Sequence, residues 1–139
     1  MKILLSNPPW NINGRQGVRA GSRWPHLKIP EEEGYMPYPF FLGYASSLLK
    51  KNNFAVKTID AIAQNINYES FYKLVKDYSP NLFFMEVSTP SLNHDLELIK
   101  KVKSLSDCKV AVAGPDMNIF DETFMSRYTF IDYALIGEY

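Results

Sequence analysis

Short turns rich in small, polar and rigid residues follow the most apolar runs of the sequence, and these turns are the best candidates for chemistry. Small side chains let a flat or elongated ligand approach the backbone, and hydroxyls and amides at helix N-termini bind its polar groups. Each turn alone would only end a strand, so its significance depends on several turns meeting at one edge. The candidate binding residues are Asn7, Pro8, Pro9, Trp10, Ser88, Thr89, Gly114, Pro115, Asp116, Gly137 and Glu138.

Several familiar catalytic motifs are absent from the sequence. It contains no GxGxxG, no GxxxxGK[ST] and no GxSxG, which excludes a dinucleotide fingerprint, a P-loop and a nucleophile elbow. A phosphoacceptor response regulator would carry an acidic pair and an aspartate where this sequence has Ser6-Asn7 and Ser88-Thr89. We therefore assign no catalytic residue to this chain.

The sequence also predicts no metal site built from protein side chains. Cys108 is the only cysteine, which excludes a disulfide framework or a multi-cysteine iron–sulfur site within the chain. His26 and His94 have no nitrogen, sulfur or carboxylate partner at ligand spacing, so we interpret them as surface or capping residues. Cys108 precedes an apolar strand and is interpreted as a small core residue.

A parallel sheet is needed to bring the turns together. Residues 2–7 form a short apolar run that stops at two prolines, which is typical of a central strand buried on both faces. Ser91 is the expected N-cap of the third helix. Further strands are predicted at 54–60, 82–87, 110–113 and 133–136, and helices at 40–52, 68–78, 92–105 and 122–128.

This alternation predicts an α/β fold of the flavodoxin-like (Rossmann-like) doubly wound class. The expected five-stranded parallel sheet has the order 2-1-3-4-5 and right-handed crossovers. Ligands of such sheets bind beyond the carboxyl ends of the strands, next to the first strand, which is where the turns listed above would meet.

Residues 11–36 are expected to form a long loop insertion without regular structure. The segment shows neither a helical nor a strand period, and ordinary connections in such folds take about 2–6 residues. We expect it to become ordered only with a partner, its arginines reaching a phosphate, amides or an acidic protein face. Its glycines are Gly14, Gly17, Gly21 and Gly34, and its basic residues are Arg15, Arg19, Arg23 and Lys28.

Length and charge place the chain among ordinary globular domains. Its 139 residues are expected to form one domain, 1–139, and 15 basic against 15 acidic residues give no net charge. Nothing in this balance favours nucleic acid or a membrane surface as partner, and no apolar stretch approaches a membrane span. A single cysteine and a strand that starts at residue 2 favour a cytoplasmic protein.

Taken in order, five segments resemble the N-terminal cobalamin-binding domain of cobalamin-dependent radical SAM enzymes. The resemblance implies that cobalamin is the cofactor. It also implies that a radical SAM barrel, with S-adenosylmethionine and an iron–sulfur cluster, lies beyond residue 139 as the partner of this domain. The parent enzyme would be a methyltransferase, whereas this domain alone would only hold the cofactor. The segments are KILLSNPPW, PYPFFLGYASSLLKKNNFAVKTIDA, LFFMEVSTPSL, KVAVAGP and FIDYALIGEY.

The resemblance also assigns roles to the candidate residues. Better-known cobalamin domains carry DxHxxG after the first strand, whereas residues 6–10 contain no histidine, which implies base-off cobalamin without a protein ligand on cobalt. The corrin ring would lie against residues 7–10, with Asp116 and Glu138 at its border. The nucleotide tail would pass Ser88 and Gly114, so a valine at Gly114 is expected to block uptake and leave the core intact.

Two other interpretations remain open from the sequence. One is a flavodoxin-like module that binds another flat ligand or a nucleotide. The other is a domain that binds no ligand and serves as a docking surface for its barrel.

Overall fold

A five-stranded parallel sheet forms the centre of the computed structural model, which describes residues 1–22, 24–29, 36–114 and 120–137. The strands lie in the order β5-β1-β6-β7-β8, and Ile3 of the central strand pairs with Val56 on one side and Leu82 on the other. The strands are β1 (Lys2–Asn7), β5 (Ala55–Asp60), β6 (Leu82–Glu86), β7 (Lys109–Ala113) and β8 (Tyr133–Ala134).

The doubly wound α/β class predicted from the sequence is confirmed. Counted only among the strands of this sheet, the order is second, first, third, fourth and fifth along the chain. The numbers in the labels differ from this count because three short strands of a second sheet come between β1 and β5. The last strand has two residues, so it is shorter than the predicted 133–136.

The helices begin and end where local chemistry favours it. The Asn67 side chain accepts a hydrogen bond from the Ser70 N–H (2.8 Å) at the start of α2, and Asp121 accepts one from the Phe124 N–H (2.8 Å) at the start of α4. Ser91 is the N-cap residue of α3, as expected, but its side chain makes no capping bond to the helix backbone. The helices are α1 (Phe40–Lys51), α2 (Tyr68–Tyr78), the 3-10 turn η1 (Thr89–Ser91), α3 (Leu92–Leu105) and α4 (Glu122–Arg127).

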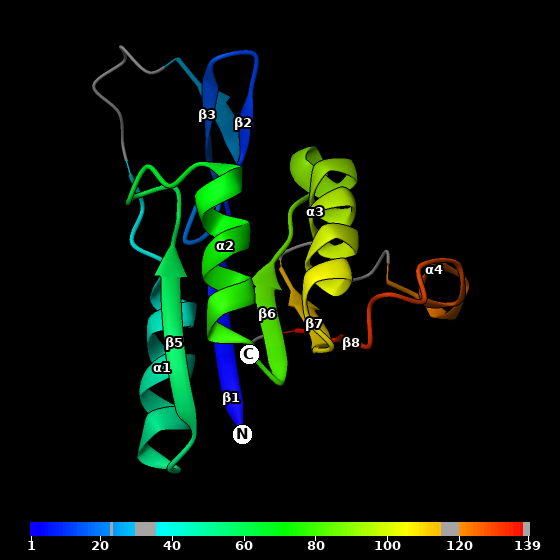
Figure 1. The fold of residues 1–139 in the computed structure, drawn as a ribbon. Helices are drawn as coiled ribbons and strands as arrows, with labels where there is room; N and C mark the ends of the chain where they lie inside the picture. The colour runs from blue at the N-terminus through cyan, green and yellow to red at the C-terminus, as the bar shows by residue number, and fades with distance from the viewer. Residues whose placement is uncertain (23, 30–35, 115–119, 138–139) are drawn as a thin grey trace.

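Two apolar cores lie on the two faces of the sheet. Alternate side chains of β1 divide between them: Leu4 belongs to one core, and Ile3 and Leu5 belong to the other. The larger core packs α2 and α3 against the sheet, while α1 packs on the opposite face (Figure 1). The sheet is thus buried on both faces near β1, as the apolar sequence of this strand predicts.

A second, antiparallel sheet lies beyond the carboxyl end of β1 (Figure 1). It consists of β2 (Asn11–Ile12), β3 (Arg15–Val18) and β4 (His26–Lys28), so the prediction of a segment without regular structure was wrong for this part of 11–36. Asn13 (φ 50°) and Gly14 (φ 77°) form its two-residue turn. Asn-Gly favours such turns because both positions need positive φ. Arg23 and Gly34 lie outside the described residues.

Candidate functional site

The carboxyl edge of the parallel sheet brings together Asn7, Ser88 and Gly114 of the predicted site, whereas Gly137 lies three residues beyond the end of β8. Asn7 is the last residue of β1, Ser88 follows β6 by two residues, and Gly114 directly follows β7. The ends of β6 and β7 are joined by a 2.7 Å hydrogen bond from the Val87 N–H to the Ala113 carbonyl. Thr89 is exposed in η1, while Pro8 and Pro9 are buried. Pro115, Asp116 and Glu138 lie outside the described residues.

A buried arginine lies at the centre of this edge. Arg19 is 3% exposed and forms an ion pair with Asp95, which is 0% exposed. The Nη1 atom that pairs with Asp95 also donates to the Ser91 hydroxyl (3.3 Å), while Nη2 donates to the Pro8 carbonyl (2.9 Å) and Nε to Asn7 Oδ1 (3.4 Å). Arg19 therefore fixes the β2–β4 sheet to both the end of β1 and the first turn of α3.

A chain of hydrogen bonds extends this ion pair to the end of β6. The Ser91 hydroxyl donates to Asp95 Oδ2 (2.6 Å) and lies 2.7 Å from the Ser88 hydroxyl. Burial raises the pKa of Asp95, and the charge of Arg19 and the bond from Ser91 act against that rise. The four side chains form one buried polar network.

Sequence reasoning missed this network, although one signal for it was present. Asp95 lies four residues after Ser91 and directly before Leu96, on the apolar stripe of the predicted helix. A carboxylate on a buried helix face requires a cationic or hydrogen-bonding partner. Arg19 was placed among residues expected to reach a ligand, but the structure pairs it inside the chain instead.

Two polar groups near the end of β1 have no hydrogen-bond partner among the described residues. They are the Trp10 indole N–H and the Ser6 hydroxyl, and both residues are buried. The Trp10 ring packs on Gly17, where a Cβ atom would come within 2.4 Å of it, and the Arg19 guanidinium lies 5.8 Å from its centroid. Leaving a buried polar group of this kind unpaired costs about 1–3 kcal/mol.

Gly114 has a structural role that the sequence interpretation did not foresee. A Cβ atom at this position would lie 2.1 Å from the Val87 carbonyl oxygen, and the backbone has φ +154°. The expectation that valine at position 114 leaves the fold intact is therefore wrong, because the side chain would collide with the backbone after β6.

Each of the two histidines lies within hydrogen-bond distance of a protein oxygen atom. The His94 Nε2 atom lies 2.9 Å from the Tyr68 hydroxyl, whose pKa is raised by burial, and the His26 Nδ1 atom lies 2.7 Å from the Trp24 carbonyl oxygen. Within the described ranges, no group of three or more His, Cys, Asp or Glu residues is arranged to hold a metal. Cys108 is buried, as predicted, and burial raises the pKa of its thiol.

These features define a doubly wound α/β domain with a polar, largely buried carboxyl edge covered by a small antiparallel sheet. No family model matches the chain. It is 24% identical, over 99% of its own length and 27% of the relative's, to an uncharacterized methyltransferase, PH0819, of Pyrococcus horikoshii. In the part of the chain that the structure describes, no helix has the length and apolar character needed to cross a membrane.

Two solved structures of TsrM, a radical S-adenosylmethionine methyltransferase from Kitasatospora setae, share the fold. One, with tryptophan substrate and the SAM analog aza-SAM bound, matches with a TM-score of 0.67, and the other, with cobalamin and a [4Fe-4S] cluster bound, with 0.63. Both are 17% identical to this chain and cover 98% of it. The chain spans about a quarter of the length of these proteins, 23% of TsrM and 27% of the Pyrococcus relative.

Proposed function

We propose that this chain is the cobalamin-binding module of a radical SAM enzyme, and that the complete enzyme is a methyltransferase. The observation that carries this proposal is the shared fold over 98% of the chain with a TsrM structure that contains cobalamin. The relation to a second methyltransferase supports the reaction class. S-adenosylmethionine and the iron–sulfur cluster would belong to the remaining part of the protein.

The residues at the carboxyl edge have donor chemistry that fits cobalamin. Its corrin ring carries amide side chains and its tail carries a phosphate, so the free indole N–H of Trp10 and the hydroxyls of Ser88 and Thr89 would serve as donors. Asn7, Pro8 and Pro9 would line the corrin side, and Pro115, Asp116, Gly137 and Glu138 would complete the border. When bound, cobalamin supplies a cobalt centre that carries a methyl group.

Arg19 imposes a condition on cofactor uptake. Its guanidinium bonds to Asn7, Pro8 and Ser91, beside the expected path of the nucleotide tail. We therefore expect the β2–β4 sheet to move, or Arg19 to exchange these partners for groups of the cofactor, when the tail enters. This role replaces the expectation that the arginine reaches the cofactor from an unstructured loop.

We also propose that no protein histidine coordinates cobalt and that cobalamin is bound base-off. The turn after β1 contains no histidine, and the two histidines of the chain have other partners, Tyr68 and the Trp24 carbonyl. The polar residues of the carboxyl edge, rather than an imidazole, would then hold the cofactor.

The test is the visible spectrum of the complete protein after incubation with cobalamin and desalting. A retained cofactor with a base-off spectrum that is unchanged in the His26→Ala and His94→Ala variants is the expected result. Retention of a flavin or nucleotide in place of cobalamin would favour a flavodoxin-like module. Retention of none of these would favour a docking domain without a ligand.

A further inference from the structure

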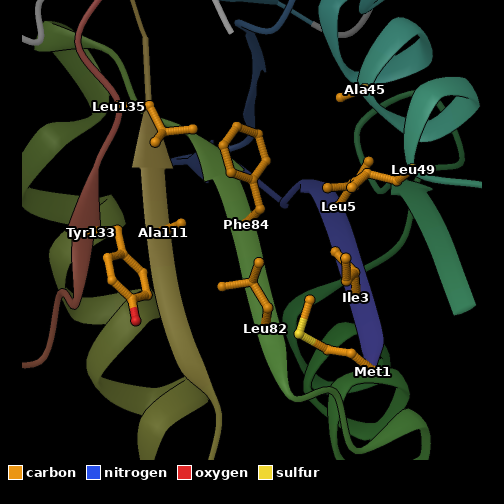
Figure 2. Close-up of a pocket in the computed structure, with 10 residues that line it drawn as sticks. All are labelled: Met1, Ile3, Leu5, Ala45, Leu49, Leu82, Phe84, Ala111, Tyr133 and Leu135. Atoms are coloured by element: carbon orange, nitrogen blue, oxygen red, sulfur yellow. The ribbon is translucent and has the colours of Figure 1, made fainter. Parts of the chain in front are cut away.

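Several residues that would hold the cofactor are buried by other parts of this chain. Asn7 is 3% exposed, Trp10 is 1% exposed and Ser88 is 2% exposed. A ligand as large as cobalamin can touch these side chains only if the elements above them move. An apolar groove of about 460 Å³ on the α1 face gives no access to them, because its lining residues, such as Ile3 and Phe84, do not include any of the three (Figure 2).

The β2–β4 sheet lies over this edge and is a separate unit of the fold. Its strands hydrogen-bond to one another and form no ladder with the five strands of the main sheet (Figure 1). Each strand has only two to four residues, and both residues of β2 are exposed. Short elements with few buried side chains are the ones that open locally while the rest of a protein stays folded.

Side chains provide the polar attachments of this small sheet to the main body. Arg19, which directly follows β3, bonds to the end of β1 and to α3. The Tyr68 hydroxyl of α2 accepts a 2.8 Å bond from the Asn11 N–H in β2. Gln16 Nε2 in β3 donates to the Ile62 carbonyl (3.1 Å). A few such bonds can break together without disturbing the ladder of the main sheet.

We propose that the β2–β4 sheet is a lid that opens as a unit and admits the ligand to the carboxyl edge, with the Arg19–Asp95 pair and the Tyr68 hydroxyl as its latches. Opening exposes Val18 and Ala20, which are each 1% exposed in the closed form, so the open form is a minor population. The role of the lid as an entrance for cobalamin rests on the proposed function. Its opening is measured without cofactor, so the two can fail separately.

Thiol labelling of the complete protein measures the opening. Ser88→Cys places a thiol at the edge and leaves every bond of Arg19 in place. The native Cys108, 2% exposed in the larger core, reports unfolding of the main sheet in the same molecule and shows that the variant is folded. N-ethylmaleimide labelling is followed for each peptide by mass spectrometry, and each rate is divided by that of the same thiol in urea.

The expected result is that the thiol at position 88 is protected from labelling, but about tenfold or more less strongly than Cys108. Equal protection of both thiols would mean that the edge opens only when the main sheet unfolds. No protection at position 88 would mean that the edge is not covered. Either result would overturn the proposal.

Removal of one latch provides a matched comparison. Tyr68→Phe keeps the ring but loses the bond from Asn11, which is broken in the open form, so the thiol at position 88 should react about three- to tenfold faster. Tyr78→Phe loses a bond to the Ala55 carbonyl (2.9 Å) that opening leaves intact, so this rate should not change. Equal rates at position 88 in the two variants would overturn the proposal. The expected rates in a protein that retains no cobalamin would keep the lid and remove only the proposed function.

Discussion

Arg19 and Asp95 are the two residues that decide whether the carboxyl edge holds together. Both side chains are almost completely buried, and the pair joins a hairpin near the N-terminus to a helix 76 residues later. Removing one member of a buried pair leaves the other charge without compensation in a poorly polarisable environment. The network is therefore a point of high sensitivity to substitution.

We predict that Asp95→Ala lowers the free energy of unfolding by about 3–5 kcal/mol, because Arg19 would remain charged and buried. Chemical denaturation of the complete protein measures this change. The exposed pair Lys73–Asp77 provides the control, since Asp77→Ala should cost less than about 1 kcal/mol. The double variant Arg19→Met/Asp95→Leu should recover most of the loss. A cost below 1 kcal/mol for Asp95→Ala would contradict the role assigned to the pair.

Asp132 provides a pH-dependent contribution to stability. Burial alone would raise its pKa, but bonds from Lys109 (2.8 Å), Lys103 (2.9 Å) and the Val110 N–H (2.8 Å) lower the pKa to about 2. A carboxylate with a depressed pKa stabilises the fold above its unfolded-state pKa of about 4, and this contribution is lost as the pH falls from about 4 to 2.

We accordingly predict that Asp132→Asn destabilises the protein by about 1–2 kcal/mol at pH 7, less than the full shift implies because water screens the exposed ammonium group of Lys109. The difference between wild type and variant should shrink between pH 4 and pH 2, as measured by denaturation at each pH. A difference that stays constant over that range would show that the carboxylate acts through packing rather than through its charge.

At the scale of elements, the main sheet could be predicted from sequence because its patterns are long and regular. α2 was predicted at 68–78 and observed at Tyr68–Tyr78, where apolar residues follow a helical period. The strands β2, β3 and β4 have only two to four residues each, too few for a period to appear. The sequence signal for this hairpin is Asn13-Gly14, because Asn-Gly favours two-residue turns with positive φ at both positions.

One part of the candidate site could also be predicted from the sequence, and another part could not. Asn7, Ser88 and Gly114 were predicted to share an edge because parallel strands end on the same side of a sheet, and the structure places them there. The pairing of Arg19 with Asp95 depends on how the hairpin folds back over that edge. Strand periodicity carries no information on such a contact between distant segments.

The hairpin is held in place by the contact between Gly17 and Trp10, and we predict that Gly17→Ala disrupts it. The added Cβ atom would lie 2.4 to 2.9 Å from three Trp10 side-chain atoms, so the indole must move, at a cost of about 1–3 kcal/mol. In a Trp24→Phe background, the emission of Trp10 should shift toward that of an exposed indole.

Gly14→Ala is the matched control for this change. Its backbone has φ +77° but no atom lies within 4 Å of the new Cβ, so it should cost about 1–2 kcal/mol through the turn alone. Its effect on the Trp10 emission should be small. An emission spectrum that is unchanged in Gly17→Ala would contradict the close packing of the ring.

In the whole molecule, different elements cover the two faces and the carboxyl edge of the sheet. One face carries α2 and α3 on the larger core, and the other carries α1 and an open apolar groove. The carboxyl edge is covered by the β2–β4 sheet, which Arg19 fixes to α3. The groove and the edge at which cobalamin binding is proposed lie on different parts of the sheet, so each can be tested without the other.

Trp10 allows the proposed contact with the cofactor to be tested at one side chain. Its indole N–H has no partner among the described residues, so Trp10→Phe removes a donor that the free protein does not use. We predict that Trp10→Phe lowers the stability of the cobalamin-free protein by about 1–3 kcal/mol, because the buried ring loses volume, and weakens cobalamin binding about tenfold, the effect of losing one buried hydrogen bond.

Cobalamin should also stabilise the wild-type protein by about 2.7 kcal/mol at a concentration 100 times its Kd, and by less in the variant at that same concentration. Trp24→Phe is the control, since Trp24 is 78% exposed and its loss should change neither stability nor binding. Titration of the complete protein with cobalamin, followed by absorbance, measures both affinities. Equal affinities in Trp10→Phe and Trp24→Phe would remove Trp10 from the binding site, because a donor that contacts the cofactor cannot be lost without weakening the complex.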